Sequence, residues 1–121
     1  METTALPGQT IIGVGGTVDL TTAEEFDIAV RRAFAVPERA IVIDLTSLEF
    51  ISAAGMHIID EARALSTITM QPLRVVVDDG RLVVPMLRAA GLTGSLVLFH
   101  ALDDALNADA ETRGEIVKFG R

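Results

Sequence analysis

Residues 40–45 (AIVIDL) and 50–56 (FISAAGM) decide the fold of this chain. The first run is short, rich in β-branched residues and apolar except for Asp44, without alternation, which is typical of a strand buried on both faces. In the second run Ser52 can cap a helix, because apolar residues recur at helical spacing from Ala53 to about Leu65. A buried strand, a turn and a helix that opens on small residues leave backbone N–H groups exposed at a helix N-terminus. Such a place suits an anion or the close approach of a partner.

Apolar strands and amphipathic helices alternate along the rest of the chain. Further strands are predicted at 9–14, 73–77 and 95–99, and further helices at 21–34, 81–90 and 102–108. Gly15-Gly16 ends or bends the first strand, and the residues before Pro7 are compatible with one more short strand. Thr21 or Thr22 is expected to cap the first helix, and the structure of 109–121 is left open. This order predicts an α/β fold whose sheet has parallel central strands.

Composition predicts one globular domain with its own core, because half of the 121 residues are hydrophobic and only 22% are charged. Seventeen acidic and ten basic residues give a net charge of −7, which argues against binding nucleic acid or an anionic membrane surface. The chain has no cysteine, so disulfides, zinc–thiolate sites and thiol nucleophiles are excluded. The sequence shows neither a signal peptide nor an apolar run of about 18 residues. We therefore expect a soluble cytoplasmic protein without a cofactor.

Four motifs in register resemble the STAS domain, best known in bacterial anti-sigma factor antagonists. The 50–55 segment resembles that family's Phe-x-Asp-Ser-Ser/Thr-Gly motif, and 16–23 resembles its Gly-x-x-Asp-x-x-Thr-Ala element. Asp44-Leu45 is similar to the end of the family's central strand, and 87–92 to its Leu-x-x-x-Gly-Leu. The resemblance covers about 9–108. It implies a single STAS domain over 1–121 with a C-terminal extension, and a mixed sheet of four to five strands flanked by about four helices.

The resemblance also shows where this chain departs from the family. Ser52 occupies the position of the family's Asp, Ala53 that of its phosphorylated Ser, and Ala54 that of the second hydroxyl residue. In the family a kinase-type anti-sigma factor phosphorylates that Ser, and the unphosphorylated form binds the anti-sigma factor and frees a sigma factor. Ala53 cannot accept phosphate. The resemblance therefore implies an antagonist that is not switched by phosphorylation at the usual position.

The candidate partner-binding residues lie in two segments that the fold is expected to bring together. They are Asp19, Thr21, Ser52, Ala53, Ala54, Gly55, Met56 and His57.

Each polar candidate also has a structural interpretation. Ser52 is either a helix cap that accepts an N–H bond from Ala54 or Gly55, which we favour, or a displaced phosphorylation site. Asp19 and Asp44 either form an acidic rim or bond to nearby backbone N–H groups in turns. His57 is either a contact residue or an exposed helix histidine, and with His100 it makes no metal site.

The leading hypothesis is a regulatory interaction module that binds an anti-sigma factor. A soluble STAS subunit of a lipid ABC transporter and a small-ligand-sensing STAS domain are the alternatives. Catalytic arrangements such as Ser-His-Asp or Cys-His are not evident in the sequence, so we do not expect an enzyme. The expected partner is a kinase-type anti-sigma factor, with no direct contact to nucleic acid or insertion into a membrane, and the chain itself is expected as a monomer or weak dimer.

Overall fold

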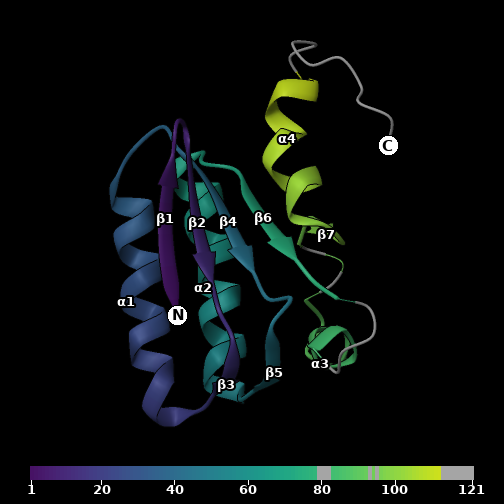
Figure 1. Cartoon of the computed structure of the whole chain (residues 1–121). Coiled ribbons are helices and arrows are strands. Elements are labelled where there is room, and N and C mark those ends of the chain that lie inside the picture. The colour runs from purple at the N-terminus through teal and green to yellow at the C-terminus, as the bar shows by residue number, and fades with distance from the viewer. Residues whose placement is uncertain (79–82, 93, 95, 113–121) are drawn as a thin grey trace.

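The computed structural model describes residues 1–78, 83–92, 94 and 96–112, and it is an α/β sandwich around one sheet (Figure 1). The five-stranded sheet has the order β1-β2-β4-β6-β7. The bounds are β1 Glu2–Leu6, β2 Gln9–Gly13, β4 Ala40–Asp44, β6 Leu73–Val76 and β7 Leu98–Phe99. Only the β1/β2 pair is antiparallel among these described strands, and the other neighbours are parallel. The predicted α/β class with parallel central strands is confirmed.

β1, the strand before Pro7, is longer than the sequence indicated. β1 pairs with β2 along all five residues, through a hairpin whose Gly8 has a φ of +75°. The guanidinium of Arg39 donates to the carbonyl oxygens of Leu6 and Gln9 and, at 2.9 Å, to Thr10 Oγ1. These bonds hold both ends of the hairpin turn against the start of β4, which is why a weakly patterned segment becomes a full strand.

A second, two-stranded sheet lies beyond the first and was not predicted. β3 (Gly16–Val18) pairs in parallel with β5 (Leu48–Ile51). The two strands continue the β2/β4 pair, since the N–H of Val14 donates to the carbonyl of Asp44 at 2.9 Å and that of Gly16 to Ser47 at 3.1 Å. Gly16 has a φ of +67°, a conformation that glycine adopts without steric cost and that lets the chain bend between the sheets.

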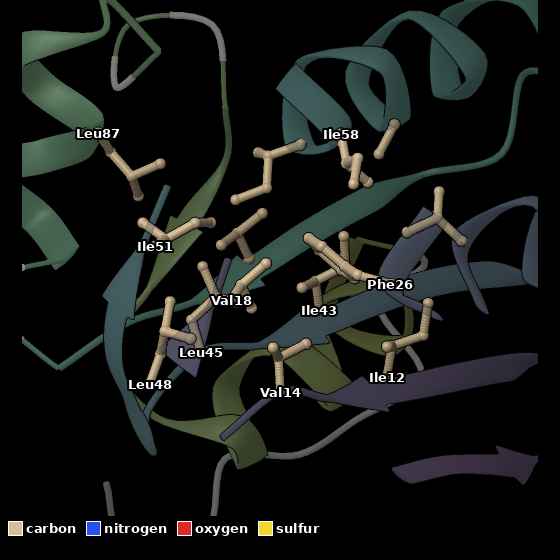
Figure 2. Close-up of a cluster of buried hydrophobic side chains, with 14 of the residues drawn as sticks. Ile12, Val14, Val18, Phe26, Ile43, Leu45, Leu48, Ile51, Ile58 and Leu87 are labelled. Carbon is tan, nitrogen blue, oxygen red and sulfur yellow. The ribbon is translucent and has the colours of Figure 1, made fainter. Parts of the chain in front are cut away.

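Helices cover the two faces of the main sheet unequally. α1 (Leu20–Ala35) and α2 (Ala53–Thr69) pack on one face, where Ile41 and Ile43 of β4 join the larger core cluster. α4 (Leu102–Thr112) packs on the other face, where Val42 meets Ala105. Figure 2 shows the larger cluster, in which strand residues gather around Phe26 of α1, Ile58 of α2 and Leu87 of α3 (Val83–Ala89).

Several predicted boundaries were wrong by a few residues. α1 is capped by Asp19 instead of Thr21 or Thr22, because the Asp19 carboxylate captures the N–H groups of both. α2 runs to Thr69 instead of Leu65 and ends at Met70, which has a φ of +57°. β6 ends at Val76, and β7 is confined to Leu98–Phe99. The predicted start of the third helix at 81–82 and residues 113–121 lie outside the described part of the chain.

Candidate partner-docking site

The β3/β5 pair brings the two predicted segments together. Val18 is the register partner of Ile51, and the N–H of Ser52 donates to the carbonyl oxygen of Val18 at 2.8 Å. The residues that follow these strands, Asp19 and Ser52, are the N-caps of α1 and α2. Two helices therefore begin side by side at the same end of the small sheet (Figure 1).

Asp19 forms a complete capping box. Its Oδ1 accepts bonds from the Thr21 hydroxyl at 2.7 Å and from the N–H groups of Thr21 and Thr22 at 2.9 and 3.1 Å. In return, the Asp19 N–H donates to Thr22 Oγ1 at 2.8 Å. The Thr21 hydroxyl, followed by the two backbone donors, lowers the pKa of Asp19 below its ordinary value. The predicted bonding of Asp19 to turn N–H groups is thus present, and the residue is also exposed.

Ser52 has the geometry of a helix cap. Its hydroxyl oxygen accepts a bond from the Gly55 N–H at 3.3 Å, and its carbonyl accepts one from Met56 at 3.0 Å. The side chain is half-buried. The favoured interpretation of Ser52 as a helix cap is therefore confirmed, and of the two predicted donors, Ala54 and Gly55, the bond comes from Gly55.

The first turn of α2 presents a methyl group to solvent. Ala53 is exposed, whereas Ala54 and Met56 are half-buried and pack against the larger core cluster. His57 is exposed, and its Nε2 lies 3.6 Å from Glu61 Oε1. Glu61 also pairs with Arg31 of α1 at 3.2 Å, so this histidine borders an ion pair that joins the two helices.

Gly55 has a different role from the one its place in the motif indicated. It is buried, and a Cβ atom added there would lie 2.5 Å from Ile51 Cγ1 and 2.8 Å from Val18 Cγ1. Contacts of this kind are too short for carbon atoms, so only glycine lets α2 approach β3 and β5 this closely. Gly55 therefore sets the position of its neighbours and is unavailable as a contact residue.

Ala53, Met56 and His57 form one wall of a groove between α2 and α3 with a volume of about 890 Å³. The opposite wall comes from α3 and the residues after it, none of which was among the predicted partner-binding residues. The groove is lined by Ile51, Ala53, Met56, His57, Asp60, Arg63, Met86, Ala89, Ala90, Gly91 and Leu92. Its lining is mostly small or flexible apolar groups, and Asp60 and Arg63 pair with each other at 2.9 Å.

Two large apolar side chains near the helix starts were also missed. Leu20, the residue after Asp19, is 81% exposed, and Phe50, two residues before Ser52, is 48% exposed. Phe50 pairs in register with Thr17 on β3. The exposure of Phe50 carried no clear sequence signal, because it depends on β5, a strand that the sequence did not predict.

Asp44 serves a turn. Its Oδ1 accepts bonds from the N–H and hydroxyl of Thr46 at 3.0 and 2.7 Å, directly after β4. The interpretation of Asp44 as a turn residue is therefore confirmed.

A membrane-spanning helix and a metal site are both absent from the described residues. No helix there has both the length and the apolar composition to cross a membrane. No group of three or more His, Cys, Asp or Glu side chains in that part of the chain is placed to hold a metal ion.

The fold defines a class of protein that has been solved before. A crystal structure of an anti-sigma factor antagonist from Mycobacterium paratuberculosis matches with a TM-score of 0.77 and 29% identity, over 88% of this chain and 90% of that one. The anti-sigma factor antagonist SpoIIAA in its unphosphorylated form matches with a TM-score of 0.76 over 97% and 98% of the two chains. Its 14% identity makes the second likeness one of fold alone.

The chain belongs to the STAS domain family, whose pattern matches residues 1–105. The anti-sigma-F factor antagonist RsfB of Mycobacterium tuberculosis is 31% identical over 99 residues, which are 82% of this chain and 80% of RsfB. The family resemblance found in the motifs is therefore confirmed.

Proposed function

We propose that this protein is an anti-sigma factor antagonist that binds a kinase-type anti-sigma factor in the cytoplasm and thereby frees a sigma factor. The docking face consists of Asp19, Leu20, Thr21, Ser52, Ala53, Met56 and His57, together with the adjoining α2/α3 groove. The names of the relatives support the role, and the exposed methyl group of Ala53 carries the finer proposal.

The chemistry of the face favours a protein partner. Exposed Ala53 and Leu20 and half-buried Met56 offer apolar contact area next to the polar caps of two helices. Such a mixture of apolar and polar groups is common in protein interfaces, where methionine adapts to the partner's shape. A phosphate group with two negative charges in the same place would have to be desolvated when the partner docks. Unless a positive group of the partner paired with it, this desolvation would cost roughly several kcal/mol.

The proposed antagonist is not controlled by phosphorylation at the family's usual position. Ala53 has no hydroxyl group, and the nearest one, on Ser52, is half-buried and accepts the Gly55 N–H at 3.3 Å. Phosphorylation of Ser52 would require the cap bond to break before the hydroxyl could reach a kinase. The complex should therefore persist in the presence of ATP.

The test mixes the purified chain with each kinase-type anti-sigma factor of its source organism and measures affinity by calorimetry, with and without a prior incubation with Mg-ATP. The proposal expects one partner to bind equally well in both conditions, with no gain of phosphate in the intact mass. Ala53→Ser is the matched variant, and phosphate added only to that variant would show that the kinase addresses position 53.

Failure to bind any of these anti-sigma factors would refute the antagonist role. Phosphate on the unmodified chain that is absent from Ser52→Ala would refute the unswitched form of the proposal alone. Co-purification with a membrane permease would favour a transport subunit instead.

A further inference from the structure

A second groove lies on the other flank of α1, between this helix and the edge of the main sheet. Its volume is about 800 Å³. The lining residues are Met1, Thr3, Ala5, Thr10, Thr21, Glu24, Glu25, Ile28, Ala29, Arg32, Ala33, Val36 and Arg39. We call it the β1 groove, because β1 is the edge strand that forms its floor and its residues Glu2–Ala5 are exposed.

The edge strand lacks the features that normally block pairing with another strand. Its sequence, Glu-Thr-Thr-Ala-Leu, contains one charged residue and no proline, and all five residues are in regular register with β2. One side of such a strand presents unpaired N–H and C=O groups. Proteins usually protect such edges with lysine, proline, a bulge or a covering element.

The wall of the groove is apolar in its middle. Ile28 and Val36 of the α1 segment are 42% and 50% exposed, although both lie beside a sheet edge where apolar side chains are normally covered. A partner that adds a strand to β1 would also cover these two side chains.

The charges along the groove are complementary to those of a second copy that lies antiparallel to the first. Glu24 and Glu25 lie in the first half of α1 and Arg32 in the second. β1 and α1 run in the same direction along the sheet edge (Figure 1). A two-fold axis that pairs β1 with a second β1 antiparallel therefore places the acidic half of one α1 opposite Arg32 of the other. The ion pairs of α1 that the structure describes involve Arg31 and Asp27 instead.

We propose that a second copy of this chain occupies the β1 groove, with the two β1 strands paired antiparallel about a two-fold axis. The five-stranded sheet then continues into its copy, and each Arg32 faces Glu24 and Glu25 of the other protomer. The interface is isologous, so every contact occurs twice. Thr21 lies at the end of this groove and also in the docking face, so dimerisation and partner binding meet at the start of α1.

Sedimentation velocity from micromolar to millimolar concentration tests the proposal. The unmodified chain is expected to form a reversible dimer. Arg32→Glu makes the attractive contacts of both protomers repulsive and should raise the dimer dissociation constant by about tenfold or more. Glu24→Arg/Glu25→Arg/Arg32→Glu exchanges the signs along the groove and should restore the dimer.

Arg88→Glu is the matched control, because it makes the same change in net charge at an exposed residue of α3, away from the groove. It should leave the dissociation constant unchanged. Hydrogen exchange gives a second measurement: the amides of β1 should become more protected as concentration rises.

A chain that stays monomeric at every concentration would overturn the proposal and leave the groove to an extended peptide of another protein. A dimer that Arg32→Glu does not weaken, or that the charge exchange does not restore, would place the interface elsewhere.

Discussion

Replacing Gly55 with alanine tests the packing that positions the start of α2. An alanine Cβ would lie 2.5 Å from Ile51 Cγ1, 2.8 Å from Val18 Cγ1 and 3.0 Å from Ile51 Cδ1. Ile51 and Val18 are each 1% exposed and belong to the larger core cluster, so neither can move without disturbing its neighbours. Overpacking of this kind costs about 1–3 kcal/mol, and contacts this short belong in the upper half of that range.

The same substitution also has a stabilising effect on the helix. Alanine stabilises a helix by about 1 kcal/mol relative to glycine. The net free energy of unfolding should therefore fall by about 1–2 kcal/mol, which lowers the Tm by about 4–8 °C for a domain of this length. Without the short contacts the substitution would stabilise the protein, so the direction of the change distinguishes the two cases.

Urea unfolding followed by circular dichroism provides the measurement. Gly94→Ala is the control, because a Cβ there has nothing within 4 Å, and it should be neutral or slightly stabilising. Combining Gly55→Ala with Val18→Ala removes one of the clashing atoms, so the double variant should lose less stability than the two single losses combined. An unchanged or increased stability of Gly55→Ala would refute the close approach of α2 to β3 and β5.

Three further variants test the caps and the buried polar contacts. Ser52→Ala removes the bond from the Gly55 N–H and should cost about 1 kcal/mol in urea unfolding; no loss would contradict the capping role. Asp19→Asn tests a carboxylate whose pKa is lowered in the folded state, so its stabilisation is present above the unfolded pKa of about 3.9 and is lost as pH falls through the folded value. The stabilities of this variant and the unmodified chain should therefore converge in acid. A difference in stability that stays constant from neutral to acidic pH would show that the Asp19 charge does not contribute. Gln71→Met removes the donor that bonds the carbonyls of Val36 and Arg39 at 2.8 and 3.0 Å. Thermal unfolding should show that the free energy of unfolding falls by about 1–3 kcal/mol. An unchanged stability would mean that those carbonyls find other donors.

The main elements of the fold were predictable from hydrophobic patterning. Residues 40–45 and 73–77 are apolar except for Asp44 and Arg74, and β4 and β6 are indeed buried strands covered on both faces. The exposed β1 was only weakly indicated, because its stability comes from Arg39 and the hairpin turn, which a local pattern does not record. β5 was missed because its first and last residues are buried and the two between them are exposed. This burial pattern is neither the alternation of a half-buried strand nor the continuous run of a fully buried one.

The sequence indicated part of the proposed docking face. Ser52 was predicted from local chemistry as the cap of α2, whereas the cap of α1 was placed at Thr21 or Thr22 instead of Asp19. The pairing of β3 with β5, which brings Asp19 beside Ser52, was not predicted. The second wall of the α2/α3 groove depends on how two distant helices pack, so Met86 and Ala89 carried no local signal. Gly55 was assigned to the surface because a glycine in a turn motif does not reveal whether its hydrogen atom faces solvent or a neighbouring strand.

The proposed partner docks against the exposed, uncharged start of α2, and Ala53→Asp places a negative charge at that position. A carboxylate in the first turn of a helix is stabilised by about 0.3–1 kcal/mol, so the variant should fold at least as well as the unmodified chain. Ala101→Asp is the matched control, since Ala101 is an exposed alanine whose carbonyl accepts the Ala105 N–H at the start of α4.

Calorimetry against the anti-sigma factor that binds this chain gives the deciding number. We predict that Ala53→Asp weakens binding by at least tenfold, roughly the effect of burying one unpaired charge at an interface, while Ala101→Asp binds normally. An Ala53→Asp variant that binds as tightly as the unmodified chain would contradict the account.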